Sequence, residues 1–355
     1  MKIVNIILTS QNGGAEQAFL DYSSALKNLG HEVVAILKAD APYAAEVEKL
    51  GITVKKIENK FGYYDFFAVQ NIKKILQETA ADLVVSHISR ATVLTRKAVK
   101  KIKNKKVFQI AVNHSGNVKR SIGADIVLSV NQRIFFDTVE KGQNAERSFV
   151  IPNAIDLSDV LEASPQASLQ TKEKITIGTI GRLDRSKGFD YAIKSLKNLE
   201  KISDKNFVLK IAGDGYYEPV LRNLVKELGL EEKVEFLGWI KNKKEFFNSI
   251  DIFCLPSKNE PFGIVILEAM KFAKPIISTD ADGPREILTH EKDALMVALE
   301  PQTNTEERIA SAVVRMVNEP ELMNELVKNA ALKLRERYSY KALEKRLGEI
   351  VGKVG

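Results

Sequence analysis

The sequence predicts an α/β protein made of two consecutive doubly wound domains, each with a parallel sheet. Three observations predict this fold class. The 355 residues are about two domains' worth of chain, more than one hydrophobic core normally supports. Short β-branched runs alternate with amphipathic stretches, as is typical of βαβ units. The alternation stops after Pro152-Asn153 and starts again after a polar stretch that has no apolar periodicity.

The first half contains seven stretches that predict strands. Between the first two, residues 15–29 carry apolar side chains at helical spacing, and Gly30 provides a stop signal. The opening stretch from Met1 to Leu8 lacks a long apolar segment and a signal-peptidase site, so we expect a first buried strand there. The strands are predicted at 2–8, 32–37, 53–57, 82–86, 106–112, 125–130 and 148–151.

The pattern also predicts the domain limits. We expect a first domain at 1–155, a linker at 156–174, a second domain at 175–337 and a C-terminal helix at about 338–355 that packs back on the first domain. In the second domain we predict strands at 175–180, 207–211, 234–237, 251–255 and 275–278, helices at 189–199, 218–228, 243–248 and 263–272, and closing helices from about 305.

The composition excludes several classes of protein. A single cysteine, Cys254, excludes a disulfide framework and a cysteine-based zinc site. No apolar run approaches the roughly 20 residues that a membrane span requires. With 45% hydrophobic and 28% charged residues, we expect a globular protein of the cytoplasm, peripheral on the inner face of the cell membrane if its basic surface binds lipid.

The positive charge lies in the first half of the chain. Residues 1–150 carry 22 Lys or Arg against 14 Asp or Glu, whereas the rest carries 31 against 32. Between Leu83 and Ala124 there are ten basic residues and no acidic one. Five of them are expected to lie outside the apolar face of a helix in the stretch 93–106: Arg96, Lys97, Lys100, Lys101 and Lys103.

We interpret this basic stretch as a contact for an anionic partner. Our hypothesis is an anionic membrane surface, because clustered lysines gain about 1 kcal/mol each near anionic lipid. Nucleic acid is the competing anion, and we do not expect it because aromatic residues are not interleaved along the stretch. A solvated helix face without a partner is the simpler alternative.

Each domain opens with a strand, a glycine-bearing turn and a helix. Ligands of open α/β sheets bind beyond the carboxyl ends of strands. Gly13 and Gly14 allow an anion to approach the next helix N-terminus, although a tight turn with positive φ would also use them. In the second domain Arg182 and Lys187 can surround a diphosphate beside a helix start, the alternative being two incidental surface cations.

Two carboxylates flank an apolar run in the stretch that follows the predicted strand 251–255. Glu260 lies in a turn marked by Pro261 and Gly263, and Glu268 lies one to two helical turns further along. A charge beside buried surface costs several kcal/mol unless it is paired or used. Carboxylates accept hydrogen bonds from the vicinal hydroxyls of sugars. The alternative is that Glu260 caps the helix and that Glu268 is exposed on its outer face.

With these motifs the chain resembles the retaining nucleotide-sugar glycosyltransferases of the GT-B fold, specifically glycosyltransferase family 4. The resemblance implies two Rossmann-like domains that face each other across a cleft. Ala154 departs from the family pattern, which often has glycine there. The supporting features occur in the family's order: Gly13-Gly14-Ala15-Glu16, Ile151-Pro152-Asn153, Gly181-Arg182…Lys187-Gly188, Gly213-Asp214-Gly215, Phe236-Leu237-Gly238 and Glu260-x₇-Glu268.

The resemblance implies a role for each matching residue of the second domain. Arg182 and Lys187 would bind the donor diphosphate and stabilise its charge as it leaves. Glu268 would hold the ribose hydroxyls. Glu260 would hold the hydroxyls of the donor sugar together with the backbone N–H groups of Phe262, Gly263 and Ile264. Gly213 would belong to the donor site, and Trp239 would line the base pocket or bury a strand end.

In the first domain, the resemblance implies that Gly14 brings backbone amides to the phosphate and that His114, after a strand, contacts the transferred sugar. No metal or cofactor is expected in this family. Asp280-Ala281-Asp282 resembles a metal-binding Asp-x-Asp, but it lies next to Gly283-Pro284 and is interpreted as a polar turn. Domain closure would assemble the two halves.

The activity implied is transfer of a hexose from a nucleotide sugar to a glycan or glycolipid, with retention of configuration, in cell-envelope polysaccharide or lipopolysaccharide biosynthesis. A nucleotide-sugar epimerase or phosphorylase on the same fold is one alternative. A non-enzymatic basic module that binds lipid or polyanion is another. The sequence leaves the donor base, the sugar and the acceptor open.

Overall fold

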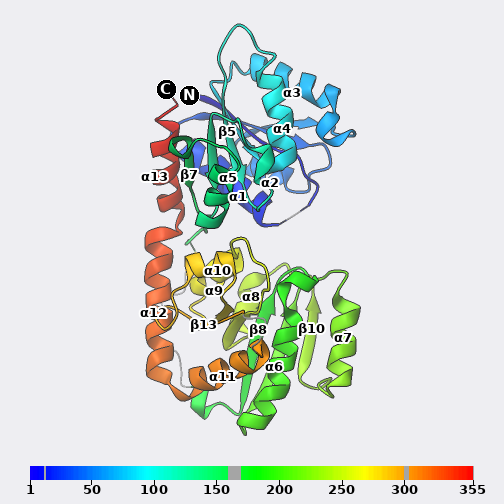
Figure 1. Ribbon diagram of the computed structural model, residues 1–355, viewed down its shortest axis with the longest axis vertical. Coiled ribbons are helices and arrows are strands. Elements are labelled where there is room, and N and C mark those ends of the chain that lie inside the picture. The colour runs from blue at the N-terminus through cyan, green and yellow to red at the C-terminus, as the bar shows by residue number, and fades with distance from the viewer. Residues whose placement is uncertain (12, 159–168, 300–303, 355) are drawn as a thin grey trace. The chain divides into compact units, whose positions relative to one another are not determined.

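The computed structural model describes residues 1–11, 13–158, 169–299 and 304–354. The chain forms two compact units, Met1–Ile155 with Tyr338–Gly355, and Asp156–Arg337 (Figure 1). Ten residues of the predicted linker, 159–168, lie outside the described residues. None of the described helices is both long and apolar enough to cross a membrane.

The first unit is built on a sheet of seven parallel strands in the order β3-β2-β1-β4-β5-β6-β7. This confirms the predicted fold class, and each predicted strand boundary lies within two residues of the observed one. The strands are β1 (Lys2–Ile7), β2 (Glu32–Lys38), β3 (Thr53–Ile57), β4 (Leu83–His87), β5 (Phe108–Asn113), β6 (Ile126–Ser129) and β7 (Ser148–Val150).

Helices cover both faces of this sheet. Along β1, Ile3 and Ile7 pack into one hydrophobic cluster and Val4 and Ile6 into another, as expected of a parallel strand buried on both faces. The helices are α1 (Gly14–Asn28), α2 (Ala44–Lys49), α3 (Phe66–Glu78), α4 (Ile88–Val99), α5 (Gln132–Glu140) and α13 (Tyr340–Val351), with 3₁₀ turns η1 (Gly62–Tyr64), η2 (Val118–Arg120) and η3 (Ala145–Arg147).

The last helix, α13, belongs to the first unit and packs on α1 (Figure 1). Its apolar side chains Leu343 and Leu347 are buried in the same cluster as Phe19. Polar contacts add to this packing, since the Tyr340 hydroxyl donates to an Asp21 carboxylate oxygen at 2.6 Å. The chain returns to the first unit where the Ile155 N–H donates to the Tyr338 carbonyl at 2.8 Å.

The second unit repeats the same design with six parallel strands in the order β10-β9-β8-β11-β12-β13. Its strands are β8 (Lys174–Ile180), β9 (Asn206–Ala212), β10 (Val234–Gly238), β11 (Ile252–Leu255), β12 (Ile276–Thr279) and β13 (Leu295–Val297). Its helices are α6 (Phe189–Ile202), α7 (Glu218–Glu227), α8 (Lys243–Asn248), α9 (Ile264–Lys271), α10 (Asp282–Ile287), α11 (Thr305–Asn318) and α12 (Pro320–Arg337), with 3₁₀ turns η4 (Leu169–Thr171) and η5 (Arg185–Lys187).

The structure corrects the prediction of a basic helix through 93–106. Helix α4 ends at Val99, Lys100 is its C-cap, and the following residues up to Val107 are irregular. Lysines at a helix C-terminus interact favourably with the helix dipole, but the run of cations that follows contains no acidic residue that could pair with them along a longer helix. Lys101 and Lys103 therefore lie past the helix, and Arg96 and Lys97 lie in its last turn.

Close backbone contacts join the loops that follow the strands of the second sheet. The Gly213 N–H donates to the Gly238 carbonyl at 2.7 Å, and Gly213 has φ +126°. A Cβ on Gly213 would lie 1.9 Å from the Gly181 carbonyl oxygen. The loops after β8, β9 and β10 can therefore approach one another only with glycine at this position.

This contact makes Gly213 a test of loop packing. We expect Gly213→Ala to destabilise the second unit by several kcal/mol, because the added carbon meets rigid backbone in a conformation that L-residues rarely adopt. Gly229→Ala is the matched control, since Gly229 also has positive φ but has open space around it. It should cost only about 1–2 kcal/mol. Equal losses in chemical denaturation would contradict the packing argument.

Candidate active site

Arg182 and Asp184 form the start of the loop between β8 and α6. The Arg182 Nε donates to an Asp184 carboxylate oxygen at 3.0 Å, while most of the Arg182 side chain is exposed. Burial opposes ionisation of Asp184, but hydrogen bonds from Ser186 and Arg182 hold its carboxyl pKa below the usual range. The guanidinium is thus oriented by a carboxylate that stays ionised, and it projects into solvent.

Lys187 and Glu260 join two loops of the second unit. Their Nζ and Oε2 atoms are 2.7 Å apart, and the side chains are only 21% and 12% exposed. The same loops are also joined through the backbone, because the Ser186 carbonyl accepts from the N–H groups of Lys258 and Asn259 at 2.8 and 3.1 Å. The structure therefore brings Lys187 and Glu260 together, although 73 residues separate them in sequence.

Helix α9 begins directly after the Glu260 turn. Gly263 is its N-cap with φ +94°, and no side chain caps the helix, so Glu260 is not the cap that the alternative interpretation required. The turn is held by the Gly283 N–H, which donates to the Glu260 carbonyl at 2.8 Å. Phe262 is buried, and the backbone at Gly263 and Ile264 forms the positive end of the helix dipole.

Glu268 is buried one turn along α9, which rules out the alternative of an exposed outer-face residue. Its Oε1 accepts from the Lys243 Nζ at 2.5 Å, whereas its Oε2 is buried and has no hydrogen-bond partner among the described residues. A buried acceptor without a partner costs about 1–3 kcal/mol or more. An unpaired carboxylate oxygen in such a place fits a ligand that donates hydrogen bonds, such as a hydroxyl.

Gly213 and Trp239 lie close to each other, because the Gly213 N–H binds the carbonyl of Gly238, the residue before Trp239. More than half of the Trp239 side chain is exposed. Trp239 therefore does not bury a strand end, and of its two predicted roles only the contact with a ligand remains as a proposal.

In the first unit, helix α1 begins at the predicted glycine pair. Gly13 is the N-cap with an extended backbone, φ −160°, and no side chain caps the helix. The alternative that these glycines serve a turn with positive φ is therefore wrong. Gly13 and Gly14 are exposed, and the uncapped N–H groups of the first turn of α1 can accept an anion.

His114 follows β5 and pairs with His87 at the end of β4. The His87 Nδ1 and the His114 Nε2 are 3.0 Å apart. His87 is fully buried against the edges of the Phe19 and Tyr22 rings. The two remaining ring nitrogens, Nε2 of His87 and Nδ1 of His114, are buried and have no partner among the described side chains.

Burial keeps both histidines of this pair neutral. It lowers the pKa of His114 to about 4 and the pKa of His87 well below 6.5, with the neighbouring His114 adding to the latter shift. In a neutral pair only one ring donates the proton between them, so each ring fixes the tautomer of the other. The backbone is also strained here, since Ile88, a β-branched residue, has φ +62°.

Sequence reasoning missed His87 and Lys243. His87 is the last residue of a buried strand, and that position was the only signal available for it. Lys243 lies 25 residues before Glu268 and carries no local motif.

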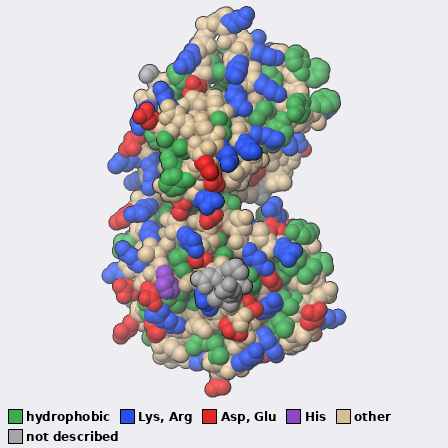
Figure 2. All heavy atoms as spheres, viewed as in Figure 1, with side chains coloured by type: hydrophobic (Ala, Val, Ile, Leu, Met, Phe, Trp, Pro, Cys, Tyr) green, Lys and Arg blue, Asp and Glu red, His purple; other side chains and the backbone are tan. Residues whose placement is uncertain are grey.

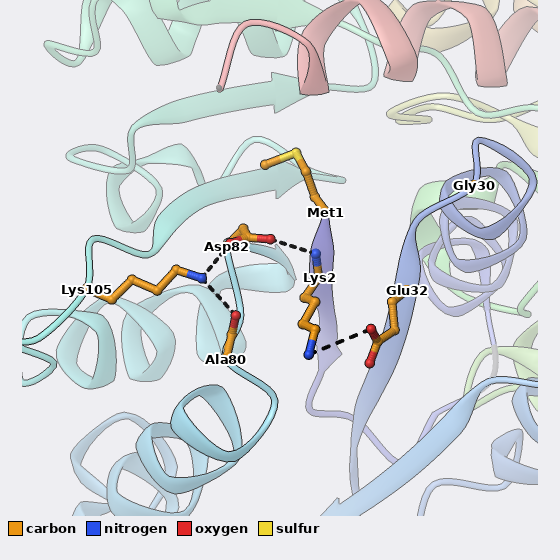
Figure 3. A pocket seen from close by; sticks show the side chains of 7 residues that line it. All are labelled: Met1, Lys2, Gly30, Glu32, Ala80, Asp82 and Lys105. Carbon is orange, nitrogen blue, oxygen red and sulfur yellow. Dashed lines mark hydrogen bonds and ion pairs between the residues drawn. The ribbon is translucent and has the colours of Figure 1, made fainter.

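Two other features of the described chain lie apart from these residues. The Asp280 carboxylate accepts from Arg285 at 2.6 Å and from the Leu299 N–H at 2.8 Å. An open surface pocket of about 420 Å³ lies at the amino ends of β1 and β2, where Lys2 pairs with Glu32 and Lys105 pairs with Asp82 (Figure 3). The strands' carboxyl ends, which carry His87 and His114, lie at the other edge of the sheet.

Comparisons with known proteins show the family and the fold of this chain. The family model described as "Glycosyltransferase Family 4" matches residues 12–159, and the model "Glycosyl transferases group 1" matches residues 161–333. The lipopolysaccharide core biosynthesis glycosyltransferase LpsD of Rhizobium meliloti is 27% identical over 97% of this chain and 96% of its own. A Campylobacter jejuni N-acetyl-D-galactosaminyltransferase named for an undecaprenol-linked glycan is 28% identical, covering 93% and 92%.

Solved structures share the fold over the whole chain. Anabaena HepE in complex with UDP-glucose superimposes with a TM-score of 0.83 at 20% identity, covering 99% of this chain and 100% of that one. The lipopolysaccharide outer core galactosyltransferase WaaB gives a TM-score of 0.79 at 20% identity, covering 99% of both chains. With one family model on each half and this architecture throughout, the chain belongs to the family 4 glycosyltransferases of the GT-B fold.

Proposed function

We propose that this glycosyltransferase moves a hexose from a nucleoside-diphosphate sugar to a glycan or lipid-linked glycan acceptor, with retention of configuration, in cell-envelope polysaccharide or lipopolysaccharide biosynthesis. The observation that carries the proposal is the arrangement of Lys187, Glu260 and Glu268 around the start of α9. The names of relatives support the substrate classes: HepE was solved with UDP-glucose, and LpsD acts in lipopolysaccharide core biosynthesis.

The donor diphosphate would be bound by the cations of the β8–α6 loop. A lysine ammonium has three N–H groups, and the ion pair with Glu260 uses one of them, which leaves donors for phosphate oxygens. Arg182 would add a planar guanidinium suited to phosphate. Fixed positive groups stabilise the negative charge that develops on the leaving diphosphate, and side-chain cations supply this charge without a metal or cofactor.

Glu268 would bind the ribose hydroxyls of the donor nucleotide. Its buried Oε2 has no partner among the described residues, and a ribose hydroxyl would satisfy it. Glu260, with the N–H groups of Gly263 and Ile264, would hold the hydroxyls of the transferred sugar. Gly213 and the exposed Trp239 would contact the nucleotide.

His114 and the start of α1 would be the first unit's contribution. A neutral imidazole both donates and accepts a hydrogen bond, so it can bind a sugar hydroxyl without adding charge. The uncapped N–H groups after Gly13 and Gly14 would face the donor phosphate. His87 would act as a positioning residue that fixes the tautomer of His114. No residue of this set is an evident covalent nucleophile, so we propose front-face attack assisted by the leaving phosphate.

The first test of this proposal is Lys187→Ala. We expect a fall of about 10²- to 10³-fold in kcat, because a charge that stabilises the leaving group is lost. The measurement is acceptor-dependent release of nucleoside diphosphate across a panel of nucleotide sugars. Conversion of the nucleotide sugar to its epimer, without net release of nucleoside diphosphate, would favour an epimerase, and inorganic phosphate as the acceptor would favour a phosphorylase.

Lys201→Ala is the control, since Lys201 lies exposed in the last turn of α6, the helix that follows the Lys187 loop. It should leave turnover unchanged. Circular dichroism checks that Lys187→Ala is folded, because the change leaves Glu260 partly buried without its cation. A folded Lys187→Ala protein with unaltered turnover would contradict the role of Lys187 in binding the donor diphosphate.

A second test pairs Glu268→Gln with a donor whose ribose lacks its hydroxyls. We expect the substitution to raise the donor KM by about 10- to 100-fold, since a charged hydrogen-bond acceptor is lost. With the native protein, the dideoxyribose donor should show a similar rise in KM. With the variant, the same donor should raise KM little further, because the substitution and the missing hydroxyls remove the same contact. Glu245→Gln, on the exposed face of α8, is the control. Fully additive losses would mean that Glu268 does not touch ribose.

A third test uses the pH dependence of stability. Because the pKa of His114 falls to about 4 in the folded protein, the unfolded chain binds its proton first as the pH drops below 6.5. The contribution of neutral His114 to the free energy of unfolding is therefore present in full above pH 6.5 and is lost as the pH falls towards 4. The loss is at most about 3 kcal/mol. Calorimetry of His114→Asn should show a flatter slope between these limits. The control His290→Gln, which removes an exposed histidine, should keep the slope of the native protein. Equal slopes for the native protein and both variants would argue against a neutral His114.

A further inference from the structure

One face of the first unit gathers exposed aromatic and basic side chains. Figure 2 shows hydrophobic side chains beside Lys and Arg on the edge of this unit where Figure 1 places α3. The exposed fractions are 65% for Phe61, 87% for Tyr64, 57% for Phe66 and 70% for Phe67. With Tyr63 and the cations Lys97, Lys101 and Arg120, these residues form what we call the aromatic–basic surface.

Cations and rings alternate on this surface. The Lys97 Nζ lies 5.3 Å from the Tyr64 ring centre and donates to the Tyr63 carbonyl at 2.9 Å. The Lys101 Nζ lies 4.7 Å from the Phe66 ring, and the Arg120 guanidinium lies 3.7 Å from the Tyr63 ring. No aromatic residues are interleaved with the basic stretch in sequence, but the fold supplies them from a segment about 30 residues earlier.

The segment that carries the rings is held by one buried carboxylate. Asp65 caps α3 by accepting from the Ala68 N–H at 2.9 Å, and it also accepts from the N–H groups of Lys60 and Phe61 at 2.8 and 3.1 Å. Burial opposes ionisation, but these hydrogen bonds keep the pKa of Asp65 below its usual range. The Asp65 carboxylate is thus buried and stabilised in its ionised form by backbone N–H groups, while the aromatic side chains around it are exposed.

We propose that the aromatic–basic surface docks on an anionic lipid bilayer. Aromatic rings are stable at the boundary between headgroups and hydrocarbon, and lysine stems reach from there to the phosphates. Clustered exposed apolar side chains mark an interaction site, and the cations Lys97, Lys101 and Arg120 among them select an anionic one. The inference goes beyond the proposed function, since it concerns a surface of the first unit and not donor chemistry.

The chemistry of the rings favours lipid over nucleic acid. Single-stranded nucleic acid binds through bases that stack on open ring faces. Here Tyr63, Tyr64 and Phe66 each carry a cation over the ring. The exposed side chains of Phe61 and Phe67 have no polar group, so their transfer from water into an apolar medium is favourable.

The test is co-sedimentation of the full chain with phosphatidylcholine vesicles, with and without phosphatidylglycerol. At low salt we expect the chain to bind the anionic vesicles and not the vesicles of phosphatidylcholine alone. The variant Lys97→Gln/Lys101→Gln should bind about 25-fold more weakly, at about fivefold for each lysine. Tyr64→Ser/Phe67→Ser should lose the binding that persists at high salt. Tyr216→Ser, which removes an equally exposed aromatic residue of the second unit, is the control and should bind like the native chain.

Insertion of the rings is measured separately with a tryptophan at position 67. Because Trp239 is the single tryptophan, Phe67→Trp in a Trp239→Phe background reports only this site. Brominated lipids in anionic vesicles should quench its fluorescence and shift the emission to the blue. The proposal is overturned if the native chain binds no anionic vesicle at low salt, or if neither double variant weakens binding. It is also overturned if the same substitutions abolish binding of single-stranded RNA while vesicles are not bound.

Discussion

The ion pair between Lys187 and Glu260 is the interaction on which the second unit's site depends. Two partly buried charges lose hydration that their mutual attraction only partly restores, so such a pair seldom serves stability alone. It joins the loop that begins α6 to the loop that begins α9. The hydrogen bonds from Lys258 and Asn259 to the Ser186 carbonyl hold the same two loops in register. The pair therefore sets where a cation, a carboxylate and a helix N-terminus meet.

The two units present different electrostatics at the carboxyl ends of their strands. The second unit offers full charges, with Arg182 and Lys187 as cations and a Glu268 oxygen without a partner among the described residues. The first offers neutral dipoles, the His87–His114 pair and the uncapped start of α1. Charges suit a leaving diphosphate, and neutral dipoles suit a sugar that must be oriented without being protonated. This division fits the proposed transfer.

Much of the fold was predictable from sequence because its strands are buried on both faces and appear as continuous apolar runs. β13 was not, since three residues are too few to show a pattern. Arg182, Lys187, Glu260 and Glu268 could be proposed from the sequence because each lies in a local motif after a strand. Lys243 and His87 were missed because their partners are 25 and 27 residues away. The aromatic–basic surface was missed for the same reason, since its three segments come together through the packing of α3, η1 and η2 on α4.

The most direct measurement of the central claim compares the affinity of the native chain for a nucleoside diphosphate and for the matching nucleoside by titration calorimetry. Fixed cations beside a helix N-terminus should make the diphosphate bind at least about 100-fold more tightly, at about 1.5–3 kcal/mol for each charged contact. Equal affinities would contradict the account, because the loop around Lys187 would then hold no phosphate.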